Sequence, residues 1–225
     1  MTHTFLRSLF QRESPYAKTA SYYLCFVILG LAMAAIGPAL PGLAEQTGSS
    51  LGSISFLFTA RSLGYMIGSV IAGRLYDRYP GHPLIIAGLL LIMVAFVLIP
   101  ITSILMVLFV LVITIGITEA SIDVGSNAML VWIHGAAVPP FMNGLHFFFG
   151  LGAFLAPVLF AQFVSAGLQS TTLFWAMAGL VLPIIVIIST IPSPKIVAQT
   201  VETQSGSSSN GLIILIAAAF FLYVG

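Results

Sequence analysis

Residues 103–131 read SILMVLFVLVITIGITEASIDVGSNAMLV, an apolar run whose second half carries Glu119, Asp123 and Asn127 at intervals of four residues. A helix of this length crosses a bilayer core of about 30 Å at 1.5 Å per residue. Residues four apart share a helix face, so the three side chains form one polar stripe. A charge at mid-membrane costs about 2.5–3.5 kcal/mol. The stripe must therefore face a bundle interior or a water-filled cavity.

The composition of the whole chain agrees with a membrane protein. Apolar residues make up 59% of the 225 residues and charged residues only 6%, which excludes a soluble domain of this size. The net charge of +1 gives no basis for binding nucleic acid, and a lone cysteine, Cys25, cannot build a disulfide framework or a thiolate metal site. The sequence contains no P-loop, HExxH, GxSxG or complete dinucleotide-binding motif. We therefore expect neither an enzyme nor a cofactor.

Apolar runs between turn signals predict an all-α membrane protein with six spans. The predicted spans cover approximately residues 19–41, 53–73, 83–101, 103–131, 142–165 and 171–191. A cleaved signal peptide is the alternative for the first run, because Arg7, Arg12 and Lys18 precede it. That run is long enough to span, and further spans follow it.

The spans divide the chain into four parts. Residues 1–18 form a tail and residues 19–191 the six-helix bundle, whereas residues 192–210 have the Pro, Ser, Gln and Gly content of a solvated linker. Residues 211–225 begin another apolar run that is too short to cross a bilayer. Either a longer protein continues this run, or the last segment is not a span; a half-size transporter that works as a homodimer is the third possibility.

The basic residues predict the orientation in the membrane. Six of them fall on one side, namely Arg7, Arg12, Lys18, Arg74, Arg78 and Lys195. By the positive-inside rule this side is cytoplasmic. We expect an integral protein of a plasma or inner membrane with a cytoplasmic N-terminus.

Two further spans carry polar groups that could meet the stripe. Arg61 of the second span is the candidate ion-pair partner of Glu119, although counting from the outer helix ends places Arg61 about 12 Å deep and Glu119 about 24 Å deep. In the fifth span Asn143 and His146 share a face, and His146 could lie level with Asp123 and carry a proton. The alternatives are an ion pair that only specifies packing and a histidine that only packs.

Polar groups are distributed unequally over the spans. The second, fourth and fifth spans hold the buried polar side chains, while the third and sixth contain no ionisable residue, as expected of helices that face lipid. An arrangement of three plus three inverted helices would produce this pattern, although no repeat is visible in the sequence.

The loop after the second span carries a family resemblance. Residues 73–78 read GRLYDR and resemble the signature G-x-L-x-D-R of the major facilitator superfamily. The resemblance implies a gating latch in which the acid and base pair with neighbouring helices, with Gly73, Asp77 and Arg78 in these places. The chain continues as YPGHP at residues 79–83, without the family's basic pair, so the latch is expected to be weaker.

Within the superfamily the chain resembles the sodium-dependent glucose transporter branch and, more distantly, the fucose–proton symporters. The residues concerned are the second span, the Asp-Val-Gly-Ser-Asn run at 123–127, and LHFFFGLGAFLAP at 145–157. Glu119 falls where the fucose symporters carry a buried glutamate. The resemblance implies twelve helices in two halves, so that this chain is the N-terminal half with the start of helix seven, and a C-terminal half is its partner.

We expect secondary active transport of a small polar solute, a hexose, by alternating access. The candidate sugar-binding residues are Glu119, Asn127, Asn143 and Gln162 for the hydroxyl groups and Trp132, Tyr65 or Phe148 for the ring face. Asp123 and His146 are the candidates for coupling to sodium or protons, because a carboxylate that must be neutralised before the cavity closes links ion binding to the conformational change. The alternatives are transport of an amphipathic lipid or drug, and a membrane scaffold that transports nothing.

Overall fold

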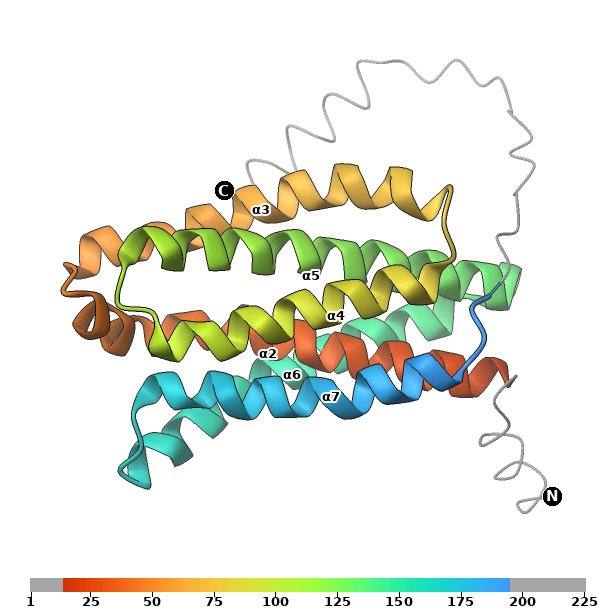
Figure 1. Ribbon diagram of the computed structural model, residues 1–225. Coiled ribbons are helices and arrows are strands. Elements are labelled where there is room, and N and C mark those ends of the chain that lie inside the picture. The colour runs from red at the N-terminus through yellow and green to blue at the C-terminus, as the bar shows by residue number, and fades with distance from the viewer. Residues whose placement is uncertain (1–13, 195–225) are drawn as a thin grey trace, which may run out of the picture.

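The computed structural model describes residues 14–194 and contains six helices that are long and apolar enough to cross a membrane (Figure 1). They are α2 (Pro15–Thr47), α3 (Leu51–Tyr76), α4 (Gly81–Leu98), α5 (Leu105–His134), α6 (Pro139–Ser165) and α7 (Leu173–Thr190), with the short 3-10 helices η1 (Ile99–Ile101), η2 (Gly135–Ala137) and η3 (Ser170–Thr172). No strand occurs between residues 14 and 194. The predicted all-α membrane fold is therefore confirmed. Residues 1–13 of the predicted tail, residues 195–210 of the predicted linker and the apolar run at 211–225 lie outside the described residues.

The first helix is longer than the predicted span of 19–41. It begins at Pro15, where a missing N–H costs nothing because the first turn leaves that group unpaired. It then continues through Pro38 and Pro41 and ends at Thr47, followed by Gly48, whose φ of 63° allows the left-handed cap that glycine favours. Neither proline ends the helix, which continues past residue 41, the predicted end of the span. The same holds for Pro157, which lies inside α6.

Consecutive helices run in opposite directions because their connections are short (Figure 1). Helices α2, α4 and α6 begin at the end of the bundle where α3, α5 and α7 finish, and we call this the N-side end. All described basic residues outside the membrane-spanning interior, Lys18, Arg74 and Arg78, lie at this end.

The packing of the helices follows a three-plus-three arrangement. The most extensive contacts join α3 to α5 and α2 to α6, and α4 packs against α7. If α2, α3 and α4 are exchanged, in this order, with α5, α6 and α7, the α3–α5 pair becomes the α6–α2 pair. The α4–α7 pair stays the same under this exchange. The predicted lipid-facing helices α4 and α7 thus also share a buried interface, with Phe96 and Phe174 in contact across it at a ring distance of 5.9 Å.

Two pairs of glycines show the same relation at the level of single residues. A Cβ atom on Gly30 of α2 would lie 2.1 Å from the carbonyl oxygen of the residue three positions before Gly152 of α6. In the reverse direction, a Cβ atom on Gly152 would lie 2.2 Å from the carbonyl oxygen of the residue three positions before Gly30. Gly64 of α3 and Gly116 of α5 make the same reciprocal contacts, each at 2.2 Å. Only glycine permits such close backbone approach. The two helix pairs therefore pack with the same geometry at corresponding residues.

A buried polar cluster joins the helices near the N-side end. Tyr22 Oη and His82 Nε2 lie 2.7 Å apart, and His82 Nδ1 lies 2.9 Å from the carbonyl oxygen of Ile191. That oxygen can only accept, so Nδ1 of His82 donates and, in the neutral ring, Tyr22 donates to Nε2. Thr19 Oγ1 and His134 Nε2 form a second bond of 2.8 Å. Helices α2 and α4 thus also hold buried polar groups, contrary to the expected restriction to the second, fourth and fifth spans.

Candidate functional site

A cavity of about 440 Å³ lies between α2, α3, α5 and α6. Its lining residues are Phe26, Leu29, Met33, Arg61, Ser62, Tyr65, Glu119, Asp123, His146 and Phe149. Arg61, Glu119, Asp123 and His146 thus gather at one cavity, whose lining on the side of α2 is apolar.

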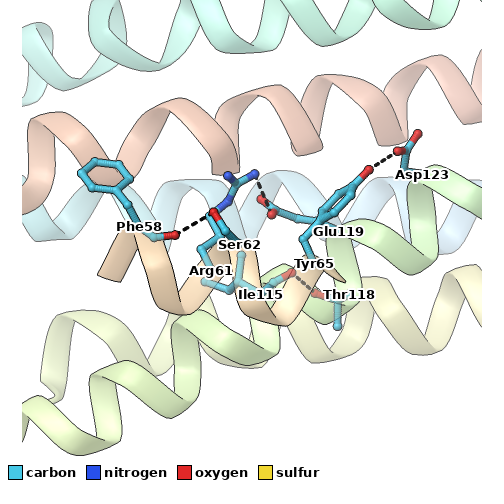
Figure 2. A network of polar contacts seen from close by, with 8 residues as sticks. All are labelled: Phe58, Arg61, Ser62, Tyr65, Ile115, Thr118, Glu119 and Asp123. Carbon is cyan, nitrogen blue, oxygen red and sulfur yellow. Dashed lines mark hydrogen bonds and ion pairs between the residues drawn. The ribbon is translucent and has the colours of Figure 1, made fainter. Parts of the chain in front are cut away.

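The polar side of the cavity is a ladder of two contacts between α3 and α5 (Figure 2). Arg61 forms an ion pair with Glu119 at 2.7 Å, and the hydroxyl group of Tyr65 donates to the carboxylate of Asp123. Arg61 and Tyr65 are four residues apart on α3, as Glu119 and Asp123 are on α5. Because α3 and α5 run in the same direction, the four side chains form two successive rungs, one helical turn apart.

The helix boundaries explain how Arg61 reaches Glu119. Helix α3 begins at Leu51, earlier than predicted, and α5 begins at Leu105, later than predicted. The two residues therefore differ in depth by four residues, or about 6 Å. The close contact of Gly64 with Gly116 brings the backbones together beside this pair. A long arginine side chain covers the remaining offset.

The Arg61–Glu119 pair retains unused polar atoms. The side chain of Glu119 is 2% exposed and that of Arg61 16%. Within the described part of the chain, Oε1 of Glu119 and Nε of Arg61 have no hydrogen-bond partner. A buried polar atom without a partner is costly. These atoms could be satisfied by water or by hydroxyl groups of a solute that enters the cavity.

Asp123 is held by neutral donors only. Its Oδ2 atom accepts from Tyr65, and its Oδ1 atom accepts from Nδ2 of Asn127 at 2.8 Å. Among residues 14–194 no basic side chain lies within ion-pair distance of this carboxylate. The cavity thus contains two carboxyl groups, those of Glu119 and Asp123, and one guanidinium group, that of Arg61.

His146 lines the opposite side of the cavity from its place on α6. Its ring meets that of Phe26 edge-on, with the centroids 6.4 Å apart. It forms no hydrogen bond or ion pair with any residue the structure describes. His146 and Asp123 thus share the cavity as expected, without a direct contact.

Five of the seven predicted sugar-binding residues, Phe148 included, do not line this cavity. Asn127 lies next to it and positions Asp123, donating to both its side chain and its backbone oxygen. Asn143 and Gln162 are exposed on α6, and Trp132 is half-buried against the core near the end of α5. Of the predicted set, Glu119 and Tyr65 are the residues that line the cavity.

The predicted gating loop lies at the N-side end. Gly73 is in the last turn of α3, and Asp77 caps that helix, its N–H donating to the oxygen of Gly73 at 3.3 Å. Asp77 and Arg78 are exposed, and neither forms an ion pair within residues 14–194. Their gating role stays a prediction.

Sequence reasoning missed most of the apolar side of the cavity. Phe26, Leu29 and Met33 of α2 and Phe149 of α6 line it. Phe148, one of the three aromatic residues proposed from the sequence, stacks instead on Tyr23 with ring centroids 4.8 Å apart. Apolar residues in an apolar span give no sign of which ones face a cavity. The feature of the sequence that could have indicated the contact of α2 with α6 is the presence of Gly30 and Gly152, which bring the two helices together.

The fold and site together define an integral membrane protein built from two inverted three-helix repeats around a polar cavity. A model of the Major Facilitator Superfamily matches residues 22–225. The chain belongs to the major facilitator superfamily, which consists of transporters rather than enzymes.

Sequence similarity to individual proteins supports this assignment. The human sodium-dependent glucose transporter 1 is 37% identical over 134 residues, which cover 60% of this chain and 26% of that protein. The zebrafish major facilitator superfamily domain-containing protein 4B is 33% identical over 161 residues, covering 71% of this chain and 30% of the relative. This chain therefore spans less than a third of the length of these two relatives.

A solved structure shows the same fold. The proton:xylose symporter XylE, bound to 6-bromo-6-deoxy-D-glucose, superposes with a TM-score of 0.72 at 13% sequence identity. The match covers 80% of this chain and 45% of that protein. The expected six-helix half of a major facilitator fold is thereby confirmed.

Proposed function

We propose that this chain is the N-terminal half of a secondary active transporter that moves a hexose across a membrane by alternating access. The observation that carries the proposal is the cavity in which Arg61, Glu119, Tyr65 and Asp123 converge within a bundle of otherwise apolar helices. Charged groups inside a membrane mark solute and ion pathways by default. The name of the human relative, a sodium-dependent glucose transporter, supports a sugar as the solute.

The chemistry of the ladder suits hydroxyl groups. Oε1 of Glu119 can accept a hydrogen bond and Nε of Arg61 can donate one, so the pair offers complementary partners to one polyhydroxylated solute. Stripping water from a sugar is costly unless the protein replaces those bonds. Glu119 and Arg61 therefore serve as binding residues while they remain paired to each other.

The coupling ion binds at Asp123 in this proposal. The carboxylate has two neutral donors and no basic partner in the described bundle, so sodium or a proton would neutralise its charge. A charge that must be neutralised before the cavity closes makes closure dependent on the ion. His146, on the facing wall, is the proposed second member of the coupling site.

The proposed topology places the N-side end in the cytoplasm of a plasma or inner membrane, following the basic residues there. The cavity opens towards a C-terminal six-helix half, with residues 192–210 as the cytoplasmic linker between the halves. Rocking of one half against the other then exposes the cavity to each side in turn.

The test is uptake of radiolabelled D-glucose into proteoliposomes that contain the full-length protein, with an imposed sodium gradient, an imposed pH gradient or neither. Concentrative uptake driven by one gradient is the expected result. If hexose binds but its uptake responds to neither gradient, the protein would be a facilitator and not a symporter. Absence of hexose binding and uptake would refute the proposal.

The apolar side of the cavity favours a second candidate. Phe26, Leu29 and Met33 would also suit an amphipathic lipid or drug. In that case an amphipathic solute would compete with, or replace, hexose in the same uptake assay. A scaffold without transport predicts instead that variants of Glu119 and Asp123 alter folding alone.

A further inference from the structure

The two glycine pairs fix which cavity residues are related by the inverted repeat. Gly30 of α2 corresponds to Gly116 of α5, and Gly152 of α6 corresponds to Gly64 of α3, because each makes the same contact with the residue three positions before its partner. Counting three residues onward from Gly30 and Gly116 pairs Met33 with Glu119. Counting three residues back from Gly152 and Gly64 pairs Phe149 with Arg61.

All four of these corresponding residues line the same cavity. Each of the two positions therefore occurs once in each helix pair. In α3 and α5 they hold the ion pair Arg61–Glu119, and in α6 and α2 they hold the apolar residues Phe149 and Met33. The cavity consequently has a charged wall on α3 and α5, and a wall on α2 and α6 that is apolar and aromatic except for His146. The backbone geometry is the same on both sides, so the difference between the walls lies in the side chains.

We propose that Phe149 and Met33 form the subsite for the apolar face of a pyranose ring, while the Arg61–Glu119 wall binds its hydroxyl groups. The inference rests on the hexose transport proposed above and assigns the orientation of the sugar within the cavity. A hexopyranose carries hydroxyl groups around its rim and C–H groups on its faces. It therefore matches a site with polar atoms on one wall and a flat apolar surface on the other.

The choice of Phe149 follows from its neighbours. Three consecutive phenylalanines occupy residues 147–149, but their rings have different surroundings. Phe147 is 67% exposed and does not line the cavity, and Phe148 stacks on Tyr23. Phe149 alone of the three lines the cavity. Phe147 is thus a matched control on the same helix, with the same side chain.

The test measures binding of D-glucose to the full-length protein by isothermal titration calorimetry. Replacing the ring in Phe149→Ala should raise the Kd about tenfold, the size expected when a stacking surface is lost. Phe149→Tyr keeps the flat ring and should stay within about threefold of the wild type. Phe147→Ala should leave the Kd unchanged.

The ion dependence separates a binding role from a general defect. Phe149→Ala should raise the KM for glucose uptake while the response to the sodium or pH gradient stays as in the wild type. Thermal unfolding without ligand reports whether the variant folds. If Phe149→Ala is unfolded, Phe149→Leu keeps an apolar side chain without the flat ring and is expected to weaken binding as well.

The outcomes distinguish this inference from the proposal on which it rests. If the wild-type protein binds no hexose, the proposed function fails and this assignment fails with it. If the wild type binds glucose and folded Phe149→Ala or Phe149→Leu binds it equally well, only the assignment of Phe149 is overturned. An equal loss in Phe147→Ala and Phe149→Ala would also overturn it, because Phe147 does not touch the cavity.

Discussion

Glu119 and Asp123 are one turn apart on the same helix, yet they differ in burial and in the groups that contact them. Glu119 is buried against a guanidinium group, whereas Asp123 is half-buried and receives bonds from a phenol and an amide. A carboxylate with a permanent basic partner needs no mobile cation. Asp123 has only neutral donors, so it is the acid to which the proposal assigns the coupling ion.

Asp123→Asn is expected to abolish the stimulation of uptake by sodium or by a pH gradient. The amide removes the charge but keeps an oxygen that can accept from Tyr65. The measurement is glucose uptake at graded sodium concentrations and pH values. Glu45→Gln, at an exposed acid near the far end of α2, is the control and should behave as the wild type. An Asp123→Asn protein with unaltered ion dependence would remove Asp123 from the coupling site.

Arg61→Leu is expected to destabilise the bundle by roughly 3–5 kcal/mol, because it leaves the Glu119 carboxylate buried without its basic partner. The double variant Arg61→Leu with Glu119→Leu removes both charges and should recover most of this loss. Thermal unfolding of the purified protein measures both. Glucose binding should be impaired in the single and the double variant alike. Failure of the second substitution to restore stability would show that the two residues are not coupled.

At the scale of residues, the sequence predicted the stripe on α5 and its arginine partner. The i, i+4 spacing and the cost of charge in a membrane were sufficient for this. The sequence could not identify Phe149, Met33 or Leu29, because an apolar side chain looks the same whether it faces lipid, core or cavity. Nor could it pair Tyr22 with His82, which are far apart in the chain and meet through tertiary packing.

At the scale of helices, close backbone contacts hold the two packed pairs together. The reciprocal contacts of Gly64 with Gly116 place Arg61 and Tyr65 beside Glu119 and Asp123. The corresponding contacts of Gly30 with Gly152 place α2 against α6. A side chain at any of these four positions would force the helices apart.

Gly116→Ala is expected to destabilise the protein by about 1–3 kcal/mol, since its Cβ atom would lie 2.2 Å from the backbone oxygen of Arg61. Gly150→Ala on α6 is the matched control, because a Cβ atom there has no neighbour within 4 Å. The control should be neutral or stabilising by about 0.5–1 kcal/mol, as alanine is the better helix former. Both are measured by thermal unfolding. Equal stability of the two variants would argue against the helix contact.

Tyr22→Phe is expected to cost about 1–3 kcal/mol, because it leaves Nε2 of His82 buried without a donor. Thermal unfolding again provides the measurement, with the exposed Tyr79→Phe as a control that should have no effect. If Tyr22→Phe unfolds at the wild-type temperature, the N-side cluster contributes little to stability.

The helices themselves were largely predictable. All six spans appear in the structure, since length and hydropathy decide whether a segment can cross a membrane. Their ends were less predictable because Pro38 and Pro41 lie inside α2, where prolines usually signal an end. Because α3 begins earlier and α5 later than predicted, the sequence overestimated the difference in depth between Arg61 and Glu119.

At the scale of the whole molecule, one fold motif is used twice with different chemistry. The inverted repeat gives α3–α5 and α2–α6 the same packing, and the cavity between them has one charged wall and one wall that is apolar except for His146. The repeat was expected from the distribution of polar groups but left no visible trace in the sequence, because backbone packing constrains only a few glycines. A solute in this cavity contacts both repeats, so its binding can report their relative position.

The central claim is that a solute occupies the cavity between α2, α3, α5 and α6. Its most direct test is alkylation of a cysteine at Ser62, which lines the cavity, in full-length protein without other reactive cysteines. We expect a water-soluble thiol reagent to modify Ser62→Cys and D-glucose to slow that modification. Glucose should not affect Ser55→Cys, an exposed position on α3 outside the cavity. Modification of Ser62→Cys at the same rate with saturating glucose and without it would contradict the account.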